Sequence, residues 1–324
     1  MIVRCFGKGY NNSNKRKELK IMLDICLLGT GGMLPLPDRH LTAMLARYNG
    51  RKLLIDCGEG TQVTMRLLGW GYKTLDIICF THYHGDHVTG LPGLLLTLNN
   101  TGRTEPLTLI GPPGLKKVVE GLTVVSRDIG FELKFMELSY EKQSLQVGDF
   151  HITVLPVPHN VKCFAYTIEN HRLPKFMVEK AQANQVPQRI WKQLQQGNTV
   201  EFEGRMYTPD MVLGEERKGI KVSYSTDCRP TQDLQEMITD SDLFICEGMY
   251  TDDAYLAQVK KHKHMLASEA ATLAKNANVK ELWLTHFSPA LPTAYINISD
   301  VKKIFANTIA GNDRMTTTID FEEA

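Results

Sequence analysis

The chain has 324 residues, with 37 Lys and Arg against 36 Asp and Glu, and a formal net charge of +1. Hydrophobic residues make up 43% of it and charged residues 23%, which is typical of a globular protein and excludes a disordered or fibrous chain. The near-zero net charge argues against a protein that coats nucleic acid or membranes through bulk charge.

The seven cysteines are spaced irregularly and include no CxxC pair. This spacing predicts neither a disulfide framework nor a zinc finger, and we expect the thiols to be reduced and buried. No apolar run approaches the ~20 residues that a membrane span requires. Asp24 also interrupts the only candidate core of a signal peptide. We therefore expect a cytoplasmic protein that does not associate with membranes.

The first 21 residues are polar and basic and show no apolar period, so we expect 1–21 to lie outside the core and Met22 to be the natural start. Residues 22–29 predict a buried strand that runs into a glycine turn. The following half of the chain predicts strands at 42–48, 52–56, 75–81 and 107–110, and helices at 62–68, 91–98 and 115–125.

The second half predicts a similar series, with strands at 152–157, 163–168, 222–226, 243–247 and 282–285, and helices at 253–261, 267–277 and 300–305. Strands that alternate with helices over 22–324 indicate one layered α/β domain. A polar, Gln-rich stretch interrupts this pattern at about 171–215. We interpret it as an arm inserted between two strands.

The strongest chemical signal is the pattern His-x-His-x-Asp-His at His82, His84, Asp86 and His87, directly after the apolar run 76–80. Imidazole and carboxylate groups together suit zinc and similar divalent ions. The alternative is an ordinary polar loop. The position of the cluster between apolar elements favours a metal site.

Three later strands also end in a residue of a type that binds metals: His159, Asp227 and His286. A lone His after a strand is more often a surface or core residue, and a lone Asp is usually a turn or helix cap. Together, in a chain that already carries the His-Asp cluster, they indicate further ligands of the same metal centre.

The metal-type residues and several further motifs of the chain resemble those of a known protein family. From Met22 onward the chain resembles the metallo-β-lactamase superfamily and, within it, the ribonuclease Z family. The resemblance rests on six motifs besides the cluster, at 28–32 (LGTGG), 54–62 (LIDCGEGTQ), 90–94 (GLPGL), 159–161 (HNV), 229–230 (RP) and 286–288 (HFS). GEGTQ and HFS point to the RNA-processing branch. The resemblance implies an α/β fold, namely an αββα sandwich with an inserted flexible arm.

The resemblance also implies two zinc ions per subunit, although the same ligand types accept Mn²⁺ or Mg²⁺. One ion would be held by His82, His84 and His159, and the other by Asp86, His87 and His286, with Asp227 bridging the two. Asp56 would orient the ligand loop through hydrogen bonds from outside the coordination sphere.

The implied reaction is removal of the 3′ trailer from precursor tRNA, which leaves a 3′-hydroxyl on the tRNA. By the resemblance, Asp86 has a catalytic role, and a Glu247–His264 pair would donate a proton to the leaving oxygen. The alternative for His264 is an exposed residue in a basic loop. Glu247 ends an apolar strand, a placement that favours a site.

Positive charge is concentrated in the first part of the inserted segment. Between 171 and 198, Glu179 is the only acidic residue, against the five basic residues Arg172, Lys175, Lys180, Arg189 and Lys192. With Trp191 between two of these cations, the segment suits an RNA backbone, which proteins grip mainly through phosphates and shape. The resemblance implies a homodimer in which one subunit's arm serves the partner's site. The alternative is a solvated helical hairpin.

Two other functions fit parts of the pattern. One is a phosphodiesterase of the same superfamily that acts on other RNA or on small or cyclic nucleotides. The other is a non-catalytic RNA-binding scaffold, which the presence of all seven ligand-type residues argues against. The chain departs from the family at Val186-Pro187 in the arm and at Pro289-Ala290-Leu291 after HFS. Neither change touches an expected metal ligand.

Overall fold

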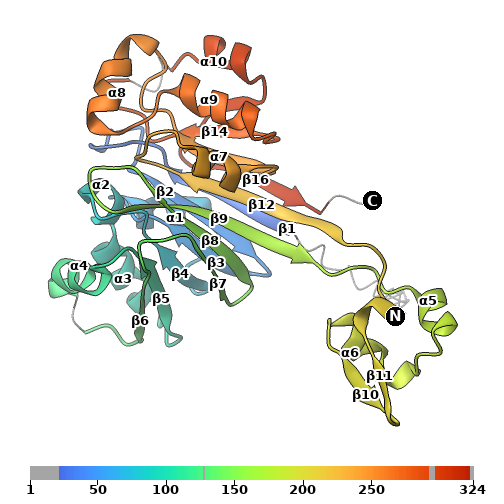
Figure 1. Cartoon of the computed structure of the whole chain (residues 1–324). Coiled ribbons are helices and arrows are strands. Elements are labelled where there is room, and N and C mark those ends of the chain that lie inside the picture. The colour runs from blue at the N-terminus through green and yellow to red at the C-terminus, as the bar shows by residue number, and fades with distance from the viewer. Residues whose placement is uncertain (1–21, 127, 292–295, 322–324) are drawn as a thin grey trace, which may run out of the picture.

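The computed structural model describes residues 22–126, 128–291 and 296–321 of the chain, so residues 1–21 lie outside the described part. Two mixed seven-stranded sheets face each other at its centre (Figure 1). The first has the order β16-β1-β2-β3-β4-β5-β6. Its strands are β1 (Met22–Gly29), β2 (Ala43–Tyr48), β3 (Arg51–Ile55), β4 (Leu75–Cys79), β5 (Leu107–Gly111), β6 (Leu133–Glu137) and β16 (Met315–Asp320).

The second sheet has the order β15-β14-β13-β12-β9-β8-β7. Its strands are β7 (Gln143–Val147), β8 (Phe150–Val157), β9 (Cys163–Arg172), β12 (Arg217–Ser225), β13 (Leu243–Glu247), β14 (Leu282–Thr285) and β15 (Thr308–Ala310). In this sheet β12, β13, β14 and β15 run parallel, while β7, β8, β9 and β12 alternate in direction.

The apolar runs of the central strands follow from burial on both faces. In β1, Leu23, Ile25 and Leu27 point into the core between the two sheets, whereas Cys26 and Leu28 pack on the other side. Successive side chains of a strand point to opposite faces, so a strand covered on both sides is apolar throughout. This is why the sequence predicts a continuous strand here instead of an alternating one.

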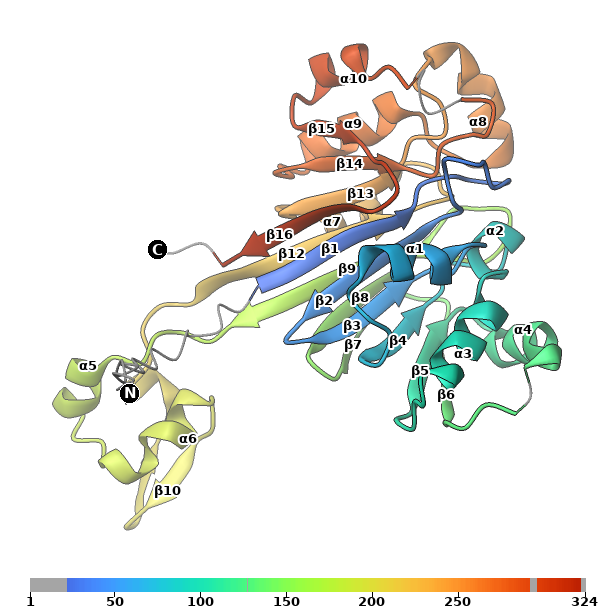
Figure 2. The same ribbon diagram turned by 180° about the vertical axis from the view of Figure 1, so that it is seen from behind.

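Helices cover the outer face of each sheet and complete an αββα sandwich (Figures 1 and 2). On the first sheet these are α1 (Thr61–Leu68), α3 (Leu91–Asn100) and α4 (Leu115–Leu122), with the single turn α2 (Gly85–Val88) at one end. On the second they are α7 (Gln232–Ile238), α9 (Ala267–Asn276) and α10 (Ser299–Ile304), with α8 (Leu256–His262) beside them. The predicted fold class is confirmed.

The inserted segment is an arm built on long extensions of β9 and β12, which pair as far as Arg172 and Arg217. It projects from the sandwich and carries α5 (Val178–Ala183), α6 (Trp191–Gln195) and a hairpin of β10 (Val200–Phe202) and β11 (Arg205–Tyr207) (Figures 1 and 2). A small apolar cluster of its own holds the arm together, formed by Ala181, Val186, Ile190, Leu194, Tyr207, Val212 and Leu213.

The hairpin changes the charge of the arm. Over 172–216, six basic side chains are matched by six acidic ones, because β10, β11 and their flanks add five acidic residues and only Arg205 on the basic side. Positive charge therefore belongs to the first, helical half of the arm and not to the whole of it.

Two other expectations can be compared with the structure. The six cysteines of the described part are all buried and carry no disulfide, as the sequence predicts. Among the described residues, no helix is long and apolar enough to cross a membrane.

Candidate active site

The His-Asp cluster begins on the loop after β4, with His82 and His84, and continues into α2, with Asp86 and His87, and Asp56 holds this segment in place through hydrogen bonds. Asp56 directly follows β3, which is parallel to β4. Its carboxylate therefore lies next to Thr81, which follows the end of β4. It is fully buried and accepts hydrogen bonds from the Thr81 backbone N–H (2.8 Å), the Thr81 hydroxyl (2.8 Å) and Nδ1–H of His87 (2.8 Å). The bond to Nδ1 leaves Nε2 of His87 facing the site.

The remaining predicted ligands come from the second sheet. β8, β12, β13 and β14 all end at the same edge of this sheet, because β8 and β12 both run antiparallel to β9, which lies between them, and β12, β13 and β14 are parallel. His159, Asp227 and His286 follow the ends of β8, β12 and β14, and Glu247 is the last residue of β13. The topology thus brings four residues together that are far apart in the sequence.

Three of these strand-end residues have a left-handed backbone: Asp56 with φ of 60°, Asp227 with 54° and His286 with 55°. Such conformations cost roughly 1–3 kcal/mol for residues other than glycine and persist where the surroundings enforce them. Here the sharp turn aims each side chain across the end of its sheet. All three residues thus combine a sharp backbone turn with a side chain that lies in the site.

The first group of ligand-type atoms consists of His82, His84, His159 and Asp227, whose atoms all lie within 4.8 Å of one another. Nδ1 of His84 is 3.0 Å from Nε2 of His82 and 3.3 Å from Nε2 of His159. Oδ2 of Asp227 is 3.7 Å and 3.8 Å from the same two Nε2 atoms.

Asp86, His87 and His286 form the second group. Nε2 of His286 lies 3.3 Å from Nε2 of His87 and 3.3 Å from Oδ2 of Asp86. Oδ1 of Asp227 is 3.3 Å from Nε2 of His87 and 3.1 Å from Nε2 of His286. The two oxygens of Asp227 therefore face different groups, as a bridging ligand requires.

This donor set fits a pair of divalent metal ions. Ligand atoms of one tetrahedral zinc, each roughly 2.0–2.1 Å from the ion, lie about 3.3 Å apart, which matches the nitrogen–nitrogen spacings in both groups. Oδ1 of Asp227 is buried and accepts no hydrogen bond from the described residues. Burial lowers the pKa of His159 to about 4, so its imidazole stays neutral, as a metal ligand must be.

Glu247 and His264 form a pair beside these groups. Glu247 is fully buried, and its Oε2 lies 2.9 Å from Nδ1 of His264 while its Oε1 accepts the Cys228 backbone N–H at 2.6 Å. Burial alone would lower the pKa of His264, but the Glu247 carboxylate outweighs that effect and raises it to about 9. The Glu247 carboxylate therefore favours the protonated form of His264.

Comparison with known proteins decides the family. The chain is 53% identical to the ribonuclease Z of Clostridium kluyveri and 52% identical to that of Agathobacter rectalis. Each match covers 93% of this chain and 100% of the relative. The chain belongs to the ribonuclease Z family.

Solved structures agree on the fold. Human tRNase Z, short form, aligns with a TM-score of 0.67 at 23% identity, over 92% of this chain and 100% of that one. The metallo-β-lactamase fold protein YhfI from Bacillus subtilis aligns with a TM-score of 0.65 at 20% identity and the same coverage. A family model described as Anti-Pycsar protein Apyc1 also matches residues 23–173, which include the His-Asp cluster and His159 but not the later ligand-type residues.

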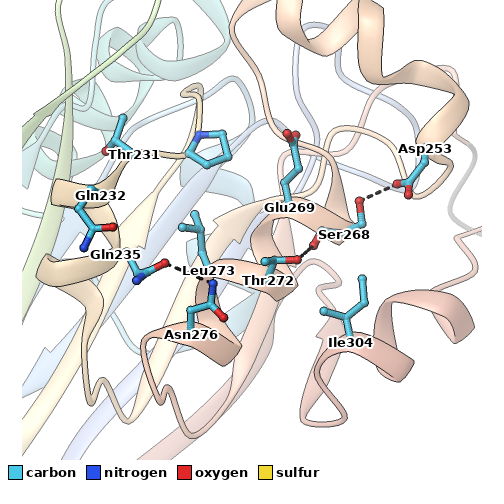
Figure 3. A pocket seen from close by; sticks show the side chains of 11 residues that line it. Thr231, Gln232, Gln235, Asp253, Ser268, Glu269, Thr272, Leu273, Asn276 and Ile304 are labelled. Atoms are coloured by element: carbon cyan, nitrogen blue, oxygen red, sulfur yellow. Dashed lines mark hydrogen bonds between the residues drawn. The ribbon is translucent and has the colours of Figure 1, made fainter.

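In this ribonuclease Z family member a pocket of about 270 Å³ opens onto the metal-type groups, and His84, Asp86, His159, Asp227 and His264 all line it. A larger hollow of about 500 Å³ lies over α7, α9 and α10 (Figure 3). Its lining is mostly neutral and polar. Glu269, which borders it, is engaged by Arg229 and by the Leu266 backbone N–H. The small pocket is therefore the candidate active site.

The structure also shows supporting residues that the sequence does not single out. The Met33 backbone N–H donates to Oδ2 of Asp86 at 2.7 Å. Gly32 lies against His286, so closely that a Cβ at this position would come within 2.5 Å of the imidazole. Gly32 belongs to the LGTGG motif, which could have flagged it, whereas a contact through the Met33 backbone leaves no signal in the sequence.

The residues predicted to contact RNA occupy the arm. Lys175, Lys180, Arg189 and Lys192 are exposed there. Trp191, by contrast, is half-buried: its ring packs against Phe176 with centroids 5.0 Å apart, and its indole N–H donates to the Val186 carbonyl. The Trp191 ring thus belongs to the small core of the arm, and an RNA contact by it stays a prediction.

Proposed function

We propose that the chain is a metal-dependent endoribonuclease that removes the 3′ trailer from precursor tRNA and leaves a 3′-hydroxyl on the tRNA. The observation that carries this proposal is the convergence of seven ligand-type side chains and the Glu247–His264 pair in one pocket of a ribonuclease Z family member.

We assign one zinc ion to His82, His84 and His159 and a second to Asp86, His87 and His286, with Asp227 between them. When bound, such ions lower the pKa of a water molecule and offset charge on the phosphate oxygens. Asp56 holds His87 in the tautomer whose Nε2 lone pair faces the site. Asp86 borders the pocket and is proposed to orient the attacking water.

In hydrolysis the water oxygen bonds to phosphorus, the bond from phosphorus to the 3′ oxygen breaks, and that oxygen needs a proton. His264 is placed to supply it, because it lines the pocket and the Glu247 carboxylate favours its protonated form. Its Nδ1 is occupied by Glu247, so the proton to be donated is on Nε2. General acid catalysis of this kind typically contributes 10²–10⁴-fold to the rate.

The arm supports the choice of tRNA as substrate. It projects from the sandwich on the side away from α2 and α8, beside which the pocket lies (Figures 1 and 2). This direction suits contact with a distant part of a large RNA or with the substrate of a second copy. We propose a homodimer in which each arm grips the RNA held by its partner. Arg172, Lys175, Lys180, Arg189 and Lys192 would contact phosphates. Because the proposed substrate is precursor tRNA, we place the enzyme in the cytoplasm.

Substrate preference tests this proposal. The purified chain is compared on a precursor tRNA transcript and on a cyclic nucleotide at matched concentrations. We expect kcat/KM to be far higher for the precursor tRNA. A preference for the cyclic nucleotide would instead support the phosphodiesterase alternative.

A further inference from the structure

A second group of metal-type side chains lies outside the active site, at the root of the arm. It consists of His151 in β8 and of Glu169 and His171 in β9, and their ligand-type atoms all lie within 4.8 Å of one another. The sequence does not single out this group, because His151 of one strand and Glu169 of the other are 18 positions apart.

Strand register brings the three side chains to one face. His151 and Glu169 are direct partners in the antiparallel pair of β8 and β9. His171 is two residues beyond Glu169, so it points to the same side of the sheet. Residues 151 to 157 of β8 separate the group from the active-site end of the strand, a distance of roughly 20 Å at ~3.3 Å per residue.

The face is the outer one, and its cover can be followed in the described part of the chain. The neighbours Phe150, Ile152 and Ile168 point the other way, into the core between the sheets. The helix α7 covers the outer face only at the far end, where Leu234 packs with Leu155 and Ala165. The side chains of His151 and Glu169 are accordingly 30% and 26% exposed.

The geometry within the group is close to that of a metal site. Nδ1 of His151 lies 3.4 Å from Oε2 of Glu169, near the spacing of about 3.3 Å between ligands of one tetrahedral zinc. The His151 and His171 rings are 5.0 Å apart and inclined by 63°. Nδ1 of His151 is also buried and has no hydrogen-bond partner among the described residues.

A basic side chain of the neighbouring strand interacts electrostatically with the Glu169 carboxylate. Lys221 is the partner of Glu169 on the other side, in β12. Its ammonium group donates to the Thr239 carbonyl at 2.9 Å, so this hydrogen bond does not occupy the Glu169 carboxylate.

We propose that His151, Glu169 and His171 form a second, structural site for a transition-metal ion such as zinc. Two imidazoles and one carboxylate are a ligand set that zinc accepts, and a water molecule completes the tetrahedron. His171 is followed by Arg172, the last residue of β9 before the arm. An ion bound here ties that end of β9 to β8 and so stiffens the root of the arm.

The test is metal stoichiometry by native mass spectrometry after equilibration with zinc. The variants His151→Gln, Glu169→Gln and His171→Gln are compared with the wild type and with Glu132→Gln, an exposed glutamate near β6 in the other sheet. We expect each of the three variants to bind one zinc ion fewer than the wild type and the control. Their hydrolysis of a small phosphodiester should be unchanged.

Hydrogen exchange supplies a second readout. Zinc should slow amide exchange at 168–175 in the wild type and in Glu132→Gln, but not in the three variants. Equal zinc stoichiometry in all five proteins would overturn the proposal, and so would zinc-independent exchange at the arm root. This outcome is separate from a failure of the proposed function, because neither measurement depends on cleavage of RNA.

Discussion

Replacement of Asp56 by Asn tests how the ligand loop is held. The carboxylate accepts hydrogen bonds from Thr81 on one side and from Nδ1–H of His87 on the other. An amide offers only one oxygen, and the Thr81 backbone N–H has to keep it. The amide N–H₂ then faces His87, which must move its proton to Nε2, the nitrogen that faces the other ligands.

The expected cost follows from that conflict. A buried donor or acceptor that loses its partner costs about 1–3 kcal/mol. At 1.4 kcal/mol per factor of ten, this cost corresponds to roughly a 5- to 150-fold loss of metal affinity. Loss of an outer hydrogen-bond partner of a metal ligand typically lowers metal affinity 10–100-fold. We therefore expect zinc affinity to fall by about 10–100-fold, measured by competition with a chromophoric chelator.

A matched control is available in the same chain. Asp240 also has a left-handed backbone, with φ of 58°, but it is exposed and bonds to Asn278 away from the site. Asn tolerates this conformation well, so neither substitution should distort the main chain. Asp240→Asn should leave zinc affinity unchanged. Equal affinity in Asp56→Asn and the wild type would refute the proposed role of Asp56.

Further substitutions test other parts of the proposed mechanism. Asp227→Ala should abolish hydrolysis, while the affinity for tRNA, measured by filter retention, should stay within about threefold of the wild-type value. Unchanged turnover would rule out the proposed metal-dependent mechanism. His264→Asn should lower kcat by 10²–10⁴ with zinc content unchanged by mass spectrometry, and a full rate would exclude His264 as the acid. Gly32→Ala should push a methyl group against the His286 ring and weaken zinc binding roughly 10–100-fold, whereas normal affinity would show that the ring can shift without cost. Replacing 173–216 with a short Gly-Ser linker should lower kcat/KM on precursor tRNA at least ~100-fold, or about 2.7 kcal/mol. Hydrolysis of a small phosphodiester should be unchanged. Equal losses on both substrates would contradict a role of the arm in RNA binding.

The elements that carry the site were the most predictable from sequence. His159, Asp227 and His286 each follow a strand whose last residues are mostly buried, and the short apolar runs at these strand ends, such as Leu282–Thr285 before His286, are easily recognised. The cluster from His82 to His87 is local in sequence, so its spacing alone indicates a metal site. The sequence does not show how the strands pair, and this pairing lets the two oxygens of Asp227 face the two groups of metal-type side chains.

The elements that were missed are polar or lie at sheet edges. β16 reads MTTTID with alternating half-buried and exposed residues, and β7 reads QSLQV with the same alternation. Neither segment has an apolar run. Each is a strand because it pairs with a neighbour, β16 with β1 and β7 with β8. β9 and β12 continue beyond their predicted ends for a similar reason, as a polar ladder that leads into the arm.

The arm was only partly predictable. Its position at about 171–215 was predicted from the break in the strand pattern, and in the structure β9 ends at Arg172 and β12 begins at Arg217. The sequence did not predict the hairpin in the acidic second half of the arm, because strands of three residues leave too short a pattern to detect. Trp191 illustrates the limit: an aromatic residue between cations suggested RNA contact, but the fold packs it against Phe176.

The central claim is that the seven converging ligand-type residues hold the metal that drives 3′ cleavage of precursor tRNA. The most direct measurement is to map the cut on a precursor tRNA transcript while zinc is titrated into chelator-stripped enzyme. We predict a single cut at the trailer junction that leaves a 3′-hydroxyl on the tRNA, with a rate that rises with zinc bound to these residues. Full cleavage by the metal-free enzyme, or a tRNA product that ends in a phosphate, would contradict the claim.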